Sequence, residues 1–180
     1  AIKRGTGEIA GAQYEQITYE GYGPEGVAVL VEVTTDNRNR TASEMRHIFS
    51  RHQGKLVASG AVAWLFERKG VILVPKEQME EEKLLELSLE AGAEDMRLVD
   101  SDYEIITEPT QLAATKAELE KQGVKPVSAE ILMYPKNTVA LDKEGAKKVL
   151  KLVEALEEND DVQEVYANFD IPESVMQELE

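Results

Sequence analysis

Two arginines in the polar stretch Asn37-Arg38-Asn39-Arg40-Thr41 are the residues best suited to bind an anion. Guanidinium groups donate paired hydrogen bonds to phosphate, and the unpaired N–H groups at a helix start add positive potential. Thr41 followed by Glu44 fits the S/T-x-x-E pattern, so the sequence predicts a helix that begins at Thr41, directly after the arginines. One hypothesis is therefore a phosphate site. In the other, Asp36, Asn37 and Asn39 only shape a tight turn whose arginines are solvated.

The helix predicted after Thr41 extends this basic region. Helical spacing places Met45, Ile48, Phe49 and His52 on one stripe that should face a sheet, and Arg46, His47, Ser50 and Arg51 on the opposite, solvent-facing side. Residues 37–60 contain five basic side chains and one acidic side chain. The predicted nucleic-acid contacts are Arg38, Arg40, Arg46, Arg51 and Lys55.

A second stretch, Gly21-Tyr22-Gly23-Pro24-Glu25-Gly26, matches the G-x-G-x-x-G pattern of dinucleotide-binding loops. That pattern works only where a helix follows and holds the pyrophosphate at its N-terminus. Here the next residues, 27–33, are rich in β-branched side chains and predict a buried strand. The sequence therefore predicts a turn between strands at 14–20 and 27–34, and no nucleotide cofactor.

Other reactive residues give no site. His47 and His52 are five positions apart, so on a helix they point in different directions and cannot share a metal ion. The acidic run 80–82 lies in the first turns of a predicted helix, where negative charge is favourable. The chain has no cysteine. With no Walker loop, H-E-x-x-H or G-x-S-x-G motif, we predict no catalytic residue, no metal and no enzymatic activity.

The net charge of −15 is distributed unevenly along the chain. Residues 1–70 carry 9 basic and 8 acidic side chains, residues 71–134 carry 6 and 15, and residues 135–180 carry 5 and 12. The acidic excess is therefore confined to the last two segments, which should repel a duplex that approaches from their side. No run of residues approaches a membrane span, and the absence of cysteine is compatible with a reducing cytoplasm, so we expect a cytoplasmic protein without a membrane partner.

The order of the predicted elements defines the fold class. Strands at 61–67 and 70–75, separated by a turn at 68–70, precede a helix at 77–91, strands near 96–100 and 103–108, a helix at 111–122 and a strand at 127–134. From residue 71 this order is β-α-β-β-α-β, which is ferredoxin-like. A helix capped by Asp142 and an alternating strand near 165–169 follow, and they have no sheet of their own.

We therefore predict an α+β protein of two domains. A discontinuous domain of residues 1–70 and 135–180, in which the C-terminal segment completes the first sheet, would contain an inserted ferredoxin-like domain of residues 71–134.

Five ordered motifs resemble the YebC/PmpR family, which includes the mitochondrial translational activator of cytochrome c oxidase. They are YEGYGPEGVAVLVEVTTDNRNRT, EMRHIFSRHQGKL, GAVAWLFERKGVI, EAGAEDM and DDVQEVYANFDI. The resemblance covers nearly the whole chain. It implies three domains, the third inserted into the second, and it identifies residues 1–70 with 135–180 as family domain 2 and residues 71–134 as family domain 3.

The resemblance also implies a function and a set of motif residues. Family members are described as DNA-binding transcriptional regulators, and others act on the ribosome, so DNA, ribosomal RNA and ribosomal proteins are the expected partners. The family's turn corresponds to Gly21, Tyr22, Gly23 and Pro24, and Tyr22 is expected at the surface. The family's loop corresponds to residues 35–41, which include Asp36, Asn37, Asn39 and Thr41. The family's opening pattern, G-H-S-K-W, is missing, so nucleic-acid binding is expected to need a preceding basic helical domain.

Overall fold

The computed structural model describes residues 13–99 and 101–179, and its contacts divide the chain into two compact units. The first unit contains the residues up to Phe66 and those from Pro135 onwards; the second is Glu67–Tyr134. Within the described residues, no helix has both the length and the apolar composition that crossing a bilayer requires.

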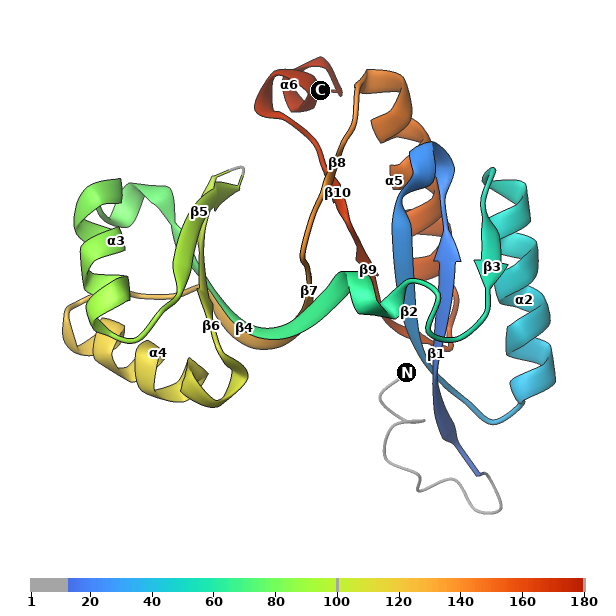
Figure 1. The fold of residues 1–180 in the computed structure, drawn as a ribbon, viewed down its shortest axis with the longest axis horizontal. Coiled ribbons are helices and arrows are strands. Elements are labelled where there is room, and N and C mark those ends of the chain that lie inside the picture. Colours follow the sequence, from blue (N-terminus) through green and yellow to red (C-terminus); the bar gives the residue numbers. More distant parts are fainter. Residues whose placement is uncertain (1–12, 100, 180) are drawn as a thin grey trace. The chain divides into compact units, whose positions relative to one another are not determined.

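The first unit is built on a four-stranded antiparallel sheet (Figure 1). Its strands, in spatial order, are β3 (Lys55–Val57), β1 (Glu15–Tyr22), β2 (Ala28–Thr35) and β9 (Val162–Ala167). The C-terminal segment therefore completes the first sheet, as the sequence predicts, since β9 pairs with β2.

Two helices cover one face of this sheet: α2 (Arg38–Arg51) and α5 (Lys143–Glu157). Alternate residues of β2 point toward them, because a strand presents successive side chains to opposite faces. The shared core consists of Val27, Val29, Val31, Val33, Met45, Phe49, Leu141, Ala146, Val149, Leu152 and Leu156. Its α2 members confirm the predicted apolar stripe.

The two helices run antiparallel to each other. Strand β2 leads directly into α2, which therefore runs back against it, whereas α5 leads into β9, which is itself antiparallel to β2. The C-terminal half of α2 consequently lies beside the N-terminal half of α5. At the other end, Asn159 Nδ2, just after α5, donates to Glu44 Oε1 of α2 at 3.1 Å.

Small elements complete this unit. The parallel pair β8 (Val139–Ala140) and β10 (Phe169–Asp170) flanks α5 in sequence, and α6 (Glu173–Leu179) packs on α5.

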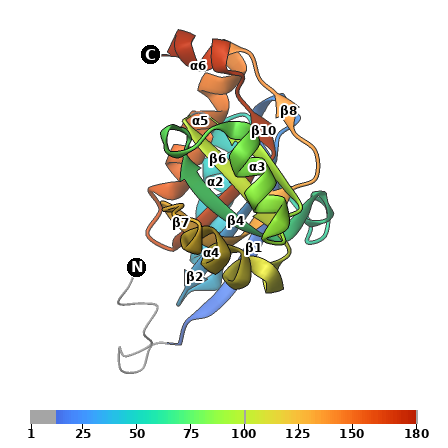
Figure 2. The ribbon, with the colours of Figure 1, turned by 90° about the vertical axis from the view of Figure 1, so that its left-hand side faces the viewer.

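The second unit has the predicted ferredoxin-like topology. Its elements are β4 (Phe66–Pro75), α3 (Glu81–Glu90), β5 (Asp95–Val99), β6 (Asp102–Thr107), α4 (Leu112–Lys121) and β7 (Ser128–Pro135). The strand order is β5-β6-β4-β7. Figure 2 shows α3 and α4 together in front of this sheet, and Leu84 and Leu119 anchor them in its core.

The predicted turn at 68–70 is wrong, because Phe66–Pro75 is one continuous strand. Gly70 pairs with Thr107 of β6, and a Cβ at Gly70 would collide with the Thr107 side chain. Its role is thus close strand packing. The strand predicted at 61–67 is wrong in its first part, because Ala63–Leu65 forms the 3-10 turn η2 and β4 begins only at Phe66.

The predicted start of the helix at residue 77 is also wrong. A 3-10 turn, η3 (Lys76–Gln78), comes first, and α3 begins only at Glu81. The Gln78 side chain explains the delay, since its Oε1 accepts from Lys125 N at 2.8 Å and its Nε2 donates to Lys125 O at 2.5 Å. These tertiary bonds hold the segment out of the helix.

Candidate nucleic-acid interface

The helix α2 begins one turn earlier than the sequence predicts. Asn37 is its N-cap, with its side-chain oxygen 3.0 Å from Arg40 N, so Arg38 and Arg40 lie on the helix and not in a loop before it. The predicted capping role of Thr41 and Glu44 is therefore wrong. An asparagine caps a helix as well as a threonine does, and Thr41 is buried in the first turns, where it makes other bonds.

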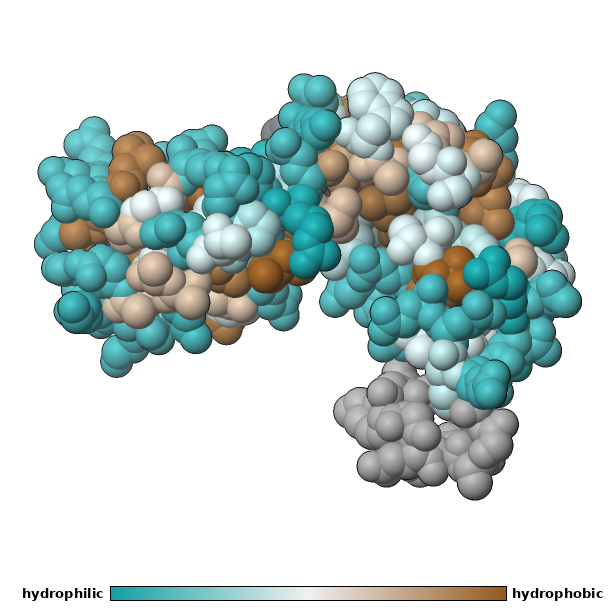
Figure 3. Space-filling model, turned by 60° about the horizontal axis from the view of Figure 1, so that its bottom comes forward, coloured by the Kyte–Doolittle hydropathy of each residue, from teal (hydrophilic) through white to brown (hydrophobic). Residues whose placement is uncertain are grey.

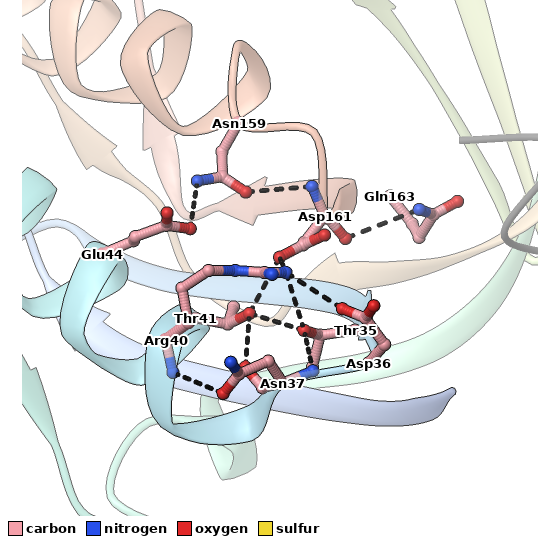
Figure 4. Close-up of polar contacts among 9 residues, drawn as sticks. All are labelled: Thr35, Asp36, Asn37, Arg40, Thr41, Glu44, Asn159, Asp161 and Gln163. Carbon is pink, nitrogen blue, oxygen red and sulfur yellow. Dashed lines mark hydrogen bonds and ion pairs between the residues drawn. The ribbon is translucent and has the colours of Figure 1, made fainter. Parts of the chain in front are cut away.

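Arg40 belongs to a polar network that joins three segments of the first unit (Figure 4). Its Nη2 lies 2.9 Å from Asp161 Oδ2, 3.2 Å from Asp36 Oδ1 and 3.4 Å from Thr35 Oγ1. The hydrogen bond to Asp161 is also the main cause of the raised pKa of Arg40. Asp161 is only 3 % exposed, so this ion pair crosslinks the start of α2 to the segment that leads into β9.

Thr41 strengthens the same crosslink. Its Oγ1 lies 2.8 Å from Asp161 Oδ2, 2.7 Å from Thr35 Oγ1 and 3.2 Å from Asn37 O. A buried carboxylate needs several hydrogen-bond donors to offset its desolvation. Thr41 and Arg40 supply two of them, so both residues have a structural role.

A hollow of about 310 Å³ lies beside this end of α2, and its lining is acidic. Its lining residues are Asp36, Arg40, Glu44, Asn159, Asp160 and Asp161. Among the lining residues that the structure describes, four carboxylates accompany one arginine, a balance of charge that disfavours a phosphate group. The geometry therefore does not favour anion binding at the N-terminus of α2.

Arg38 is paired more loosely. Its Nε and Nη2 lie 3.3 and 3.5 Å from the two carboxylate oxygens of Glu15, and both side chains are about half exposed or more, at 62 % and 49 %. Such a surface pair contributes about 0–1 kcal/mol, so a phosphate could displace Glu15 at little cost.

Arg46 and Arg51 are available to bind a ligand. Both are exposed on the C-terminal half of α2, and neither makes an ion pair with any residue that the structure describes. Arg46 lies near the hydroxyl of Tyr19, which is buried and has no hydrogen-bond partner among the described residues. Burial raises the pKa of Tyr19, and the positive charges of Arg38 and Arg46 oppose that rise.

Sequence reasoning missed three lysines that lie on the neighbouring helix. Lys147, Lys148 and Lys151 are exposed on the N-terminal half of α5, the part that lies beside Arg51. Lys147 is 3.8 Å from Glu144, and the other two make no ion pair within the described part of the chain. Knowledge that α2 and α5 pack antiparallel would have revealed these lysines as candidates. That packing cannot be predicted from local sequence. We call Arg46, Arg51, Lys147, Lys148 and Lys151 the basic helical face, meaning the solvent side of the two packed helices; Arg46 and Arg51, five positions apart, lie on opposite flanks of α2.

Lys55, the fifth predicted contact, is separated from this face by the strand register. On β1 the Cα of Gly21 lies against the Phe49 ring, on the helix-covered side of the sheet. Lys55 pairs with the next residue, Tyr22, and paired residues share a face. Its side chain therefore points to the face opposite α2.

The Gly21–Gly26 turn packs against the two helices and does not form an open loop. It joins β1 to β2, and no helix follows it, so the structure agrees with the prediction of a strand-to-strand turn. An added Cβ would lie 2.6 Å from Phe49 at Gly21 and 2.8 Å from Leu152 at Gly23. Pro24 is buried, and Tyr22 is half-buried and not fully presented at the surface. These glycines allow the turn to approach the two helices closely.

The described residues do not form a metal-binding cluster. Within residues 13–99 and 101–179, there is no group of three or more His, Asp or Glu side chains that could hold a metal ion. His47 is exposed, and His52 ends α2, where its backbone N–H donates to Phe49 O.

Comparison with known proteins gives the family. Residues 14–169 match the model described as the TACO1/YebC second and third domain, which is most of the chain. The chain belongs to the TACO1/YebC family. Because the model spans both units, this TACO1/YebC chain contains the interrupted first unit as well as the insertion.

Relatives of this TACO1/YebC chain are similar over almost its whole length. A probable transcriptional regulatory protein of Syntrophus aciditrophicus is 56 % identical over 99 % of the chain, and one of Rubrobacter xylanophilus is 58 % identical over 99 %. The chain spans 72 % of the length of each. A crystal structure of a conserved hypothetical protein, Aq1575 of Aquifex aeolicus, matches with a TM-score of 0.82 and 54 % identity over 98 % of this chain and 73 % of that one.

Proposed function

We propose that this chain is a non-enzymatic regulator of gene expression that binds the phosphates of nucleic acid through the basic helical face. The observation that carries the proposal is the exposure of Arg46 and Arg51 without carboxylate partners among the described residues, on the same side of the sheet as the exposed lysines of α5. Clustered basic side chains supply most of the affinity for a nucleic-acid backbone.

The names of the relatives support this class of function. Both curated relatives are called probable transcriptional regulatory proteins, which makes DNA the first candidate target. Neither name is that of an enzyme.

A second candidate is a translation factor that contacts ribosomal RNA, and the separation of charge favours it. The residues 71–134 carry a net charge of −9, and the acidic hollow lies at the other end of α2 from Arg51. A long duplex would be repelled by such regions, whereas a ribosome offers RNA and basic proteins as separate neighbours.

The test of binding is a double charge reversal, Arg46→Glu with Arg51→Glu. We expect the affinity for nucleic acid to fall about tenfold or more, because two attractions become repulsions, while the thermal unfolding midpoint stays unchanged. The matched control is Lys116→Glu with Lys121→Glu on the exposed side of α4, which makes the same change in net charge. If both variants weaken binding equally, only the overall charge matters and the proposed face is wrong.

Fractionation distinguishes the two targets. Cells that produce the protein are lysed at physiological salt, and the lysate is sedimented through a sucrose gradient. Sedimentation with ribosomes, abolished by the double reversal, would support the translation factor. A protein that stays in the soluble fractions yet shifts promoter DNA with sequence preference would support the transcriptional regulator.

A further inference from the structure

Trp64, the only tryptophan of the chain, is exposed and held in place. Its side chain is 63 % exposed and lies on the 3-10 turn η2. The indole N–H donates to Ala61 O at 3.0 Å. Because the only polar group of the ring is bonded internally, the free surface of Trp64 consists of its aromatic faces.

The loop that carries Trp64 is anchored by a buried carboxylate. Glu20, on the central strand β1, is 5 % exposed and accepts hydrogen bonds from the backbone N–H groups of Gly60, Val62 and Ala63 at 2.6, 2.9 and 2.8 Å. Val62 and Phe66, on either side of Trp64, are buried. The ring is therefore fixed before any partner arrives, which lowers the entropic cost of binding.

The surroundings of Trp64 fit a nucleic acid better than an apolar protein surface. The preceding residues, 58–61, are small and exposed. Among the described residues of the first unit, the other exposed large apolar side chain is Leu150, and it lies in α5, on the helix-covered side of the sheet. A protein interface needs a contiguous desolvated core, whereas one nucleobase needs one aromatic ring. On the face drawn in Figure 3, hydrophobic residues likewise form small separate patches among hydrophilic ones.

Two exposed lysines lie on backbone segments next to the Trp64 loop. Strand β3 leads directly into the Trp64 loop, and Lys55 on that strand points to the same face of the sheet as Glu20. Lys136 N donates to Leu65 O at 2.9 Å, which brings the backbone of this exposed lysine beside the residue that follows Trp64. An aromatic platform flanked by lysines is the usual arrangement for binding single-stranded nucleic acid.

We propose that Trp64 stacks on an unpaired base of an RNA strand whose phosphates contact Lys55 and Lys136. The proposal rests on the nucleic-acid-binding function above, and it adds a second contact on the opposite face of the sheet from the basic helical face. RNA is the partner because its loops and bulges present unstacked bases, which duplex DNA keeps paired.

The single tryptophan makes the test direct. The protein is titrated with a labelled single-stranded RNA of about 12 nucleotides, with the duplex of the same sequence and with the matching single-stranded DNA, and Trp64 fluorescence and RNA anisotropy are recorded together. We expect saturable quenching by the single-stranded RNA at the concentrations that raise the anisotropy. Trp64→Ala should weaken binding about tenfold, since one stacked base contributes about 1–3 kcal/mol, and Trp64→Phe should recover most of the loss. The control is Leu98→Ala, an exposed apolar residue of the second unit.

The outcomes separate this inference from the proposed function. A rise in anisotropy without quenching, with Trp64→Ala binding normally, would overturn the stacking contact and leave the basic helical face intact. Equal quenching by the duplex would refute the unpaired base, and equal quenching by single-stranded DNA would refute the choice of RNA. Absence of binding to every nucleic acid would overturn the proposed function and this inference with it. Far-UV circular dichroism of Trp64→Ala shows whether the variant is folded.

Discussion

The two halves of α2 carry similar basic residues but use them differently. In the first turn, Arg40 contacts Asp36 and Asp161 and holds the unit together. In the C-terminal half, Arg46 and Arg51 extend from the helix without such partners among the described residues. The difference arises from acids brought in by the fold, since Asp161 is 121 positions from Arg40. A basic residue is thus available to a ligand only where no distant carboxylate reaches it.

The largest expected effect comes from removing the carboxylate that distinguishes the two halves. Asp161→Ala should lower the free energy of unfolding by about 3 kcal/mol, because it removes the buried carboxylate to which both Arg40 and Thr41 are bonded. Urea unfolding measures the change. The control is Glu157→Ala, an exposed acid near the end of α5, which should change stability by less than about 0.5 kcal/mol. An equal loss in both variants would show that the network adds nothing.

A second buried carboxylate, that of Glu20, holds the Trp64 loop as Asp161 holds the first turn of α2. Burial disfavours the charged form of Glu20, but the backbone hydrogen bonds outweigh it and lower the pKa of Glu20 below its ordinary 4.5. Its stabilisation is therefore complete above pH 4.5 and is lost as the pH falls through the lowered pKa. Glu20→Gln should cost about 2 kcal/mol at pH 7, because a neutral amide accepts more weakly and adds unpaired donors.

Trp64 fluorescence reports this change directly. On acidification below pH 4.5 we expect a shift in the wild-type emission that the Glu20→Gln variant lacks. Identical pH profiles would show that Glu20 does not control the loop.

The smallest expected effects come from single alanine substitutions in the two halves of α2. Arg40→Ala should cost about 1–2 kcal/mol in unfolding free energy and leave the affinity of the folded protein for nucleic acid unchanged. Arg46→Ala should change the free energy of unfolding by less than about 0.5 kcal/mol. It should reduce the slope of log affinity against log salt concentration by about 0.7–0.9, as expected for one lost phosphate contact. Salt titrations of both variants measure the slopes. A reduced slope for Arg40→Ala would mean that the acidic hollow does bind phosphate.

Most of the fold could be predicted because local patterns determine it. The spacing of Met45, Phe49 and the apolar residues of α5 predicts the core-facing helix stripes, and the order of strands and helices after residue 70 predicts the ferredoxin-like topology. The errors occurred where tertiary bonds replace local preference. Gln78 binds a loop 47 residues away, and Gly70 serves strand packing instead of a turn.

The candidate site was less predictable, because local sequence shows neither distant acids nor strand register. Arg40 and Arg46 look equivalent in sequence, and Lys55 follows them closely yet points to the opposite face of the sheet. A charge reversal at Arg38 and Arg40 would appear from sequence to be a pure test of binding. In the structure it also breaks the bond to Asp161, so we expect it to impair folding.

The long separation between Arg40 and Asp161 has a consequence for how the chain is made. A ribosome synthesises residues 67–134 as one uninterrupted block, so every strand of the second unit is complete once residue 135 has been added. The first unit is different. Until residue 161 has emerged, the first turn of α2 has Asp36 but lacks the buried carboxylate of Asp161, and strand β2 has an unpaired edge where β9 will bind.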